Sequence, residues 1–412
     1  MYNLQELLNA LPPMLAGKEL MDAMTILPEY SENVRWELDA IRLMAMSDIY
    51  KVYVPSQMSQ EIYSKLYLAL LRSLQKKTTI TAVKQQNENF KAIRQNEYTG
   101  ILGGSDSFTI IGTSGIGKSS TISRAIGLIS CNGIIEVQEP YSRIIPCLVV
   151  QCPFDSSVKA LLLEILRKVD ELLESHYYQN AVKSKATVDM LIGSVSQIAL
   201  NHIGLLIVDE IQNVVNSKNG KSLVGMLTQL INNSGISICM VGTPESSVFF
   251  EQAMQLARRS LGLQYSKLEY TKQFYDFCNI LFEYQYVKKQ TVLDESVAQW
   301  LYEHSGGVVS IVVSLIHDAQ EIAILNGKEI LNLETLNEAY LKRMTLLHGY
   351  IEPDRKIRKQ VQKTKSKPSI LEPSVDVILE YGLADLVSKA KSENRDVVEL
   401  IKQHITVEEV MT

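Results

Sequence analysis

Short apolar runs alternate with helix-like stretches through the middle of the chain. Runs of four to six apolar residues with turn-forming residues at their ends predict strands, and there are four of them, at residues 108–111, 146–150, 205–208 and 236–241. Between them, residues 158–173 and 222–232 repeat their apolar positions with the period of a helix. Short buried strands separated by helices are typical of a parallel sheet covered on both faces. The pattern therefore predicts an α/β core.

The regions on either side of this core have a helical period instead. In the first hundred residues Ile62, Leu66 and Leu70 follow that period, while prolines interrupt it elsewhere, so several short helices are expected. After about residue 272 the strand signal fades, and four helices of a small lid are predicted at residues 274–284, 294–304, 308–325 and 333–346. The predicted organisation is an N-terminal helical extension (1–100), a core (101–272), a lid (273–350) and a tail (351–412).

The tail begins with a basic stretch. Seven lysines and arginines fall within residues 355–367, and an amphipathic segment follows at about 375–405. Such a run can follow a phosphate backbone, but it is also typical of a flexible, solvated linker. Both interpretations stay open for this stretch.

A phosphate-binding loop follows the first predicted strand. The sequence Gly-Thr-Ser-Gly-Ile-Gly-Lys-Ser satisfies the Walker A pattern G-x-x-x-x-G-K-[ST] between an apolar strand and a helix. Its glycines let successive backbone N–H groups surround a phosphate, so ATP and Mg²⁺ are the expected cofactors. Lys118 is expected to reach the β- and γ-phosphates and Ser119 to bind Mg²⁺, whereas the alternative is a fortuitous glycine turn. The predicted nucleotide-binding residues are Gly112, Thr113, Ser114, Gly115, Ile116, Gly117, Lys118, Ser119 and Ser120.

Two acidic residues end the third predicted strand. Asp209 is delivered to the edge of the sheet, where a carboxylate can hold Mg²⁺, and Glu210 is placed to act on the attacking water as a general base. The same pair would also suit a helix N-cap followed by a first-turn acid. Hydrolysis, as distinct from nucleotide binding, depends on Glu210.

Further candidates follow the fourth predicted strand. Thr243 stands at its end, where a hydroxyl can contact the γ-phosphate or the water, or can simply belong to a turn. Arg258 and Arg259 come one helix later, and either could act as an arginine finger on a neighbouring subunit. The alternative for this pair is a solvated helix end.

Composition and charge limit the classes of protein. A net charge of −5 argues against a uniformly basic nucleic-acid coat but leaves room for a local basic surface. The lysines considered for DNA contact, with plain surface lysines as the alternative, are Lys183, Lys185, Lys218 and Lys221. No apolar run approaches the roughly 20 residues that cross a bilayer, and no signal peptide or C-x-x-C pair is evident. A cytoplasmic protein without a membrane segment is expected.

Taken together, these motifs resemble a known family. Residues 205–212 (LLIVDEIQ), 241–245 (VGTPE) and 257–259 (ARR), with the Walker A loop, are similar to the TnsC-type AAA+ regulators of DNA transposition, related to TniB and more distantly to MuB and IstB. Residues 10–13 (ALPP) and the lid segment 305–313 extend the resemblance. It covers about residues 5–350.

The resemblance implies a function. It implies a bacterial ATPase that assembles as a homo-oligomeric ring or filament on double-stranded DNA, meets a target-selector protein through its N-terminal extension and a transposase through its tail. By the same resemblance Thr243 is the sensor-1 group and Arg258 or Arg259 the finger. Many AAA+ proteins carry a sensor-2 arginine in the lid, but residues 306–313 contain no arginine. A helicase loader or initiator ATPase, and a nucleotide-binding adaptor that does not hydrolyse ATP, remain as alternatives.

Overall fold

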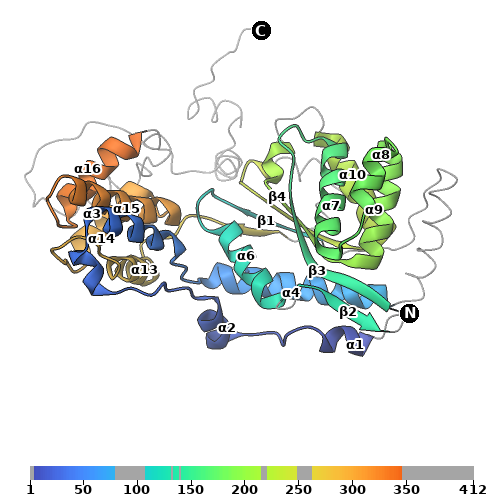
Figure 1. Cartoon of the computed structure of the whole chain (residues 1–412), viewed down its shortest axis with the longest axis horizontal. Helices are drawn as coiled ribbons and strands as arrows, with labels where there is room; N and C mark the ends of the chain where they lie inside the picture. The colour runs from blue at the N-terminus through green and yellow to red at the C-terminus, as the bar shows by residue number, and fades with distance from the viewer. Residues whose placement is uncertain are drawn as a thin grey trace, which may run out of the picture. The chain divides into compact units, whose positions relative to one another are not determined.

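A six-stranded sheet forms the centre of the protein (Figure 1). The computed structural model describes residues 4–78, 107–130, 133–138, 141–214, 220–247 and 262–345. The strands are β1 (Phe108–Gly112), β2 (Ile135–Gln138), β3 (Tyr141–Gln151), β4 (Ile203–Asp209), β5 (Ser237–Gly242) and β6 (Leu263–Tyr265). Their order in the sheet is β2-β3-β4-β5-β1-β6. The four predicted strands are confirmed as parts of β1, β3, β4 and β5.

The prediction of a parallel sheet is wrong at one edge. β2 pairs with β3 in the antiparallel direction, whereas the other neighbouring strands run parallel. Ile135 and Val137 of β2 are buried while Glu136 and Gln138 are exposed, which is the alternation of a half-covered edge strand. Apolar runs do not predict these two strands: β2 alternates buried and exposed residues, and β6 has only three residues.

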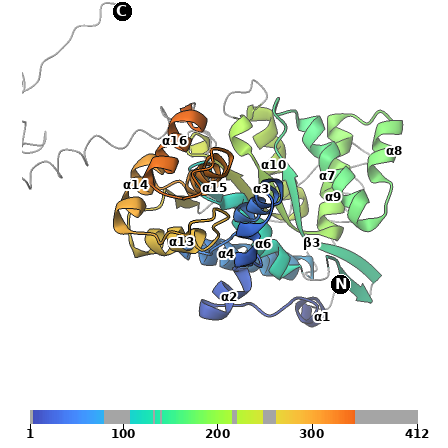
Figure 2. The same ribbon diagram turned by 60° about the vertical axis from the view of Figure 1, so that its left-hand side comes forward.

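Helices cover both faces of the sheet. Alternate residues of a strand point to opposite faces, so Leu206 and Val208 pack with one set of helices, and Leu205 and Ile207 with the other. The first set is α7 (Val158–Leu173), α9 (Val188–His202) and α10 (Gly220–Ser234), with the short α8 (Tyr177–Lys183) beside α7. The second set is α4 (Gln57–Lys77) and α6 (Lys118–Ile129). Figures 1 and 2 both show these two groups on opposite sides of the strands.

The N-terminal extension contains one long helix among shorter ones. α4 has 21 residues, so the prediction of short helices alone is wrong; its buried residues recur at helical spacing from Ser59 to Lys77 and pack on α6 and β4. The shorter elements are α1 (Leu4–Asn9), α2 (Gly17–Met24), η1 (Glu32–Trp36), α3 (Asp39–Ala45) and η2 (Met46–Lys51).

Four helices form the lid, at the positions that the periodicity predicts. They are α13 (Lys272–Phe282), α14 (Glu295–Ser305), α15 (Val309–Leu325) and α16 (Leu333–Arg343). The Asp294 side chain caps α14 by accepting from the Val297 N–H at 2.8 Å, and Gly306 ends the same helix with a φ of +58°. Asp294 thus fixes the start of α14, and Gly306 ends this helix before the sharp bend to α15.

No single helix among the described residues is long and apolar enough to cross a membrane. Together, α14 and α15 have the length and apolar composition of a membrane-spanning helix, but they are bent by 119° relative to each other. Both helices contribute to the hydrophobic core of the lid.

Candidate functional site

The predicted phosphate-binding loop lies between β1 and α6. Gly115 and Gly117 adopt φ values of +80° and +97°, which side-chain-bearing residues rarely adopt. Gly117 is the N-cap of α6, and Lys118 is the first residue of that helix. The positive end of the helix therefore faces the loop, as a phosphate site requires.

Lys118 folds back over this loop. Its Nζ donates to the carbonyl oxygens of Gly112 at 2.7 Å and Thr113 at 3.0 Å, and the residue is buried. Burial lowers the pKa of Lys118, while the carboxylates of Asp209 and Glu210 act in the opposite direction. The amine is held beside the backbone that would surround a phosphate.

The residues predicted for Mg²⁺ lie side by side. The Ser119 hydroxyl donates to Asp209 Oδ2 at 3.0 Å, across the gap between α6 and the end of β4. A serine hydroxyl and a carboxylate are the oxygen ligands that Mg²⁺ prefers. The two side chains therefore fit the ion as a pair of oxygen ligands, and phosphates and water would complete its coordination.

Glu210 is in a strained conformation next to this pair. Its φ is +58°, and its backbone N–H donates to Asp209 Oδ1 at 2.8 Å. Gln212 Nε2 donates to Glu210 Oε2, so an amide holds the carboxylate that is predicted to act on water. Sequence motifs did not identify Gln212 as part of the site. Its place in the LLIVDEIQ segment, two residues after the acid, was the available signal.

Thr243 lies between the phosphate-binding loop that follows β1 and the acidic residues at the end of β4. It follows β5, and β5 is the strand between β4 and β1 in the sheet. The Thr243 side chain hydrogen-bonds Glu245 and lowers the pKa of that carboxyl, with a smaller contribution from Lys118. Glu245 is therefore a second residue of the site that the motifs did not single out.

The lid contacts the phosphate-binding loop directly. The Ser310 N–H, in the first turn of α15, donates to the Gly115 carbonyl at 3.0 Å. A Cβ atom on Gly115 would lie 2.2 Å from Ser310 Oγ and 2.9 Å from Val308 Cγ1. The lid thus meets the loop through backbone and small side chains, at a segment without arginine.

The remaining predicted residues are placed only in part. Lys183, Lys185 and Lys221 are exposed, the first two around the connection from α8 to α9 and the third in the first turn of α10. The remaining candidates lie outside the described residues: Lys218, Arg258, Arg259 and residues 351–412.

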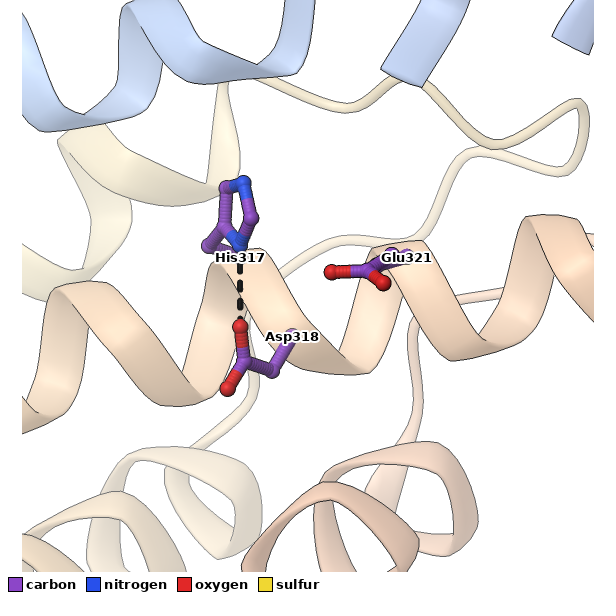
Figure 3. Close-up of side chains that lie close together, drawn as sticks. All are labelled: His317, Asp318 and Glu321. Atoms are coloured by element: carbon purple, nitrogen blue, oxygen red, sulfur yellow. Dashed lines mark hydrogen bonds and ion pairs between the residues drawn. The ribbon is translucent and has the colours of Figure 1, made fainter. Parts of the chain in front are cut away.

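A second group of possible metal ligands lies on the lid. The ligand atoms of His317, Asp318 and Glu321 on α15 are within 4.8 Å of one another. Figure 3 shows these three side chains on the helix. His317 Nδ1 lies 2.9 Å from Asp318 Oδ1, and Glu321 accepts from Arg343 at 3.0 Å. The Tyr50 ring of η2 lies 4.7 Å from the imidazole ring. These contacts account for the three side chains as packing between the lid and the N-terminal extension.

Fold and site together define a class of protein. A glycine-rich loop between a strand and a helix, an acidic strand end beside it, a polar residue on the strand between them, and a helical lid make an AAA+ P-loop protein. Residues 103–269 match the family model of the bacterial TniB protein. The predicted resemblance to TnsC/TniB-type proteins is confirmed over this segment.

Several solved structures are similar to the chain at low sequence identity. An ORC1 protein of Aeropyrum pernix in complex with DNA has 15% identity and a TM-score of 0.42, over 80% of this chain and 78% of that chain. A Drosophila ORC bound to DNA has 11% identity and a TM-score of 0.39, over 89% and 87%. The Walker-type ATPase of Pyrococcus abyssi has 11% identity and a TM-score of 0.38, over 68% of this chain and 76% of that chain. No curated protein matches the chain.

Proposed function

We propose that this protein is an ATP-dependent DNA-binding regulator of transposition. The observation that carries the proposal is the match of residues 103–269 to the TniB family model, in a chain whose phosphate-binding and acidic elements are complete. ATP binding promotes assembly of the subunits as a ring or filament on target DNA. The assembly links a target-selector protein to the transposase and activates insertion.

The site residues divide this work among them. The backbone of the loop and Lys118 bind the triphosphate, and Ser119 with Asp209 holds Mg²⁺, which would neutralise phosphate charge. Glu210 takes a proton from the attacking water, and Thr243 orients that water or contacts the γ-phosphate. Arg258 or Arg259 of a neighbouring subunit stabilises the charge that develops on the phosphate.

The hydrogen bond between Ser119 and Asp209 supports this division. It holds the two proposed Mg²⁺ ligands within 3.0 Å of each other in a fold where they come from different elements. Gln212 holds Glu210 in the described conformation. This amide occupies one of the two carboxylate oxygens of Glu210, which provides a point at which hydrolysis can be controlled.

DNA contact is proposed for the exposed lysines. Lys183, Lys185 and Lys221 are exposed, and Lys218 lies three residues before the last of them in sequence. Lysine side chains bind phosphates as point charges and give a salt-dependent affinity without sequence preference. The N-terminal extension (1–100) is assigned to the target selector and the tail (351–412) to the transposase.

The decisive experiment is electron microscopy of the purified protein with duplex DNA, in ATP or a slowly hydrolysed analogue and in ADP. Rings or filaments are expected on DNA in the ATP state only. Glu210→Gln should bind ATP and remain assembled because hydrolysis is lost, whereas Lys118→Ala should not assemble. Assembly of Lys118→Ala on DNA with ATP would overturn the mechanism, and no assembly in any state would favour an adaptor that acts without DNA.

A further inference from the structure

The N-terminal extension is divided between the core and the lid. Residues of α1, α2 and α4, such as Leu7, Leu20 and Leu66, pack in one hydrophobic cluster with α6 and the sheet. Met46 and Ile49 of η2 pack in another cluster with the lid helices. The chain therefore starts on the core, crosses to the lid, and returns to the core before α4.

Polar contacts hold the middle part of the extension on the lid. Arg42 of α3 is fully buried and donates to both carboxylate oxygens of Glu329, at 2.7 and 2.8 Å. Tyr284 donates through its hydroxyl to the Pro28 carbonyl at 3.0 Å. Residues 28–52 are thus attached to the lid by buried contacts and are expected to move with it.

The two crossings are joined to each other. Ile26 on the outward crossing and Tyr53 on the return form an antiparallel bridge, with N–H···O distances of 2.9 Å in both directions. On the core side, the carbonyls of Ala23 and Met24 each accept from Arg124 of α6 at 3.1 Å. The outgoing and returning segments are thus joined by this one bridge where the chain passes between the core and the lid, and this place is called the hinge below.

One side chain connects this hinge to the helix of the phosphate-binding loop. The Tyr53 hydroxyl lies 2.8 Å from Thr121 Oγ1 and 2.9 Å from Ser59 Oγ. Thr121 is fully buried, three residues after Lys118 on α6, and its N–H donates to the Gly117 carbonyl at 2.9 Å. Burial raises the pKa of Tyr53, so the hydroxyl keeps its proton and can donate to one partner and accept from the other.

We propose that Tyr53 is a positioning residue, whose hydroxyl couples nucleotide at the phosphate-binding loop to the position of the hinge and of the lid with residues 28–52. The loop is held from two sides, by Ser310 of the lid and, through α6, by Tyr53 of the hinge. A displacement of the loop and of the start of α6 on binding triphosphate therefore reaches both connections. The Tyr53 hydroxyl determines how far the hinge moves together with α6.

The moving segment presents an apolar surface. Trp36, Leu38 and Met44 are 70%, 74% and 73% exposed, and they belong to the part of the extension that is attached to the lid. Their placement would therefore depend on the nucleotide state. This inference rests on the proposed function only in that it requires the site to bind ATP; it requires neither DNA nor a transposase.

The test is amide hydrogen exchange in residues 39–51, measured in the full-length protein without nucleotide and with the analogue ATPγS. The wild type should show exchange that changes with ATPγS. Tyr53→Phe should bind ATPγS with nearly unchanged affinity but lose about half or more of that change. Thr121→Val should lose as much of the exchange response as Tyr53→Phe does. Thr121→Ser, which keeps a hydroxyl, should show the response of the wild type.

Two comparisons separate coupling from a general structural effect. The hydroxyl of Tyr67 donates to the Pro12 carbonyl within the core, so Tyr67→Phe removes a tyrosine hydrogen bond of the extension without touching α6 and should keep the full response. The double variant Tyr53→Phe/Thr121→Val should lose no more than either single variant, because both remove one interaction.

The outcomes distinguish this inference from the proposed function. If the wild type binds ATPγS but residues 39–51 do not respond, or if Tyr53→Phe responds fully, the coupling is wrong and the proposed function stands. If Tyr53→Phe fails to fold, Thr121→Val decides in the same way. If the wild type does not bind ATPγS at all, both the proposed function and the coupling fail.

Discussion

The carbonyl oxygen of Gly115 accepts a hydrogen bond from the backbone N–H of Ser310 at 3.0 Å. The first residue belongs to the phosphate-binding loop and the second to the first turn of the lid helix α15. No side-chain atom takes part in this hydrogen bond, but a large side chain at either residue would keep the two backbones apart. The lid can approach the loop this closely because Gly115 has no Cβ.

Gly115→Ala should therefore weaken nucleotide binding. The added methyl group would lie 2.2 Å from Ser310 Oγ, and the φ of +80° is unfavourable for alanine. Strain of about 1–3 kcal/mol is expected, and titration calorimetry with ATPγS should show a roughly tenfold or larger loss of affinity. Gly127→Ala is the control, because its Cβ meets open space on α6 and alanine should stabilise that helix by about 1 kcal/mol. Equal affinities in the two variants would contradict the role of the close contact.

Gln212→Leu should raise the basal rate of ATP hydrolysis. In the described conformation the Gln212 amide donates to one carboxylate oxygen of Glu210, so its removal leaves both oxygens available to accept from water. A hydrogen bond of about 1 kcal/mol corresponds to roughly a fivefold increase in rate. Phosphate release at saturating ATP would measure it, with Glu210→Gln as the inactive reference. A lower rate at unchanged ATP affinity would instead indicate that Gln212 positions the water.

The sequence predicted the elements that carry a strong local signal. Buried parallel strands are continuous apolar runs, so residues 205–208 were recognisable without any tertiary information. The lid helices followed for the same reason, since helical periodicity extends over three or more turns. The antiparallel β2 was missed because its two buried residues alternate with polar ones, a pattern too short to distinguish from a loop.

Tertiary partners could not be predicted in this way. Apolar periodicity shows that one face of a helix is buried, but not which part of the protein covers that face. The division of the N-terminal extension between the core and the lid could therefore not be predicted. Arg42 illustrates the point: in sequence it is a charge on a short helix, and in the structure it is fully buried against Glu329. The motifs likewise named Asp209 and Glu210, but not Gln212, whose role depends on the local turn.

Arg42→Met should destabilise the lid strongly. The guanidinium is fully buried between Glu329 at 2.7 Å and Asp39 at 2.6 Å, and the Glu329 side chain is only 13% exposed. Removal of one partner of a buried pair costs up to about 3–5 kcal/mol because the other charge is left behind, and Glu329 would keep only the more exposed Lys288 at 3.4 Å. Chemical denaturation would measure this. Arg167→Met is the control, since that arginine also pairs with two carboxylates but is exposed to solvent and should cost far less stability.

The same pair should give the protein a component of acid sensitivity. The hydrogen bond from Arg42 lowers the pKa of Glu329 below its ordinary value of 4.5. Because the folded state has the lower pKa, this contribution to stability is present above pH 4.5 and is lost as the pH falls through the folded value. The difference in unfolding free energy between wild type and Arg42→Met should therefore shrink on acidification below pH 4.5. A difference that stays constant down to acid unfolding would contradict the ion pair.

Lys77 should make stability depend on pH at the alkaline end. Its Nζ is buried at the end of α4 and donates to the carbonyls of Ala199, at 2.7 Å, and Leu200, with no carboxylate among its described partners. Burial lowers the pKa of Lys77 from 10.5 to about 7. Between these values the folded state binds fewer protons than the unfolded state, so stability rises with pH across this window, and below it the full cost of the buried charge is present.

Comparison with Lys77→Met isolates this contribution, since all other titrating groups are shared. The unfolding free energy of the wild type relative to the variant should increase between about pH 7 and 10, by at most about 1.4 kcal/mol per pH unit. Denaturation at intervals across this range would measure the slope. A flat difference would mean that the ammonium stays charged inside the protein, because the two carbonyls at the C-terminal end of α9 and the helix dipole stabilise the cation as well as water does.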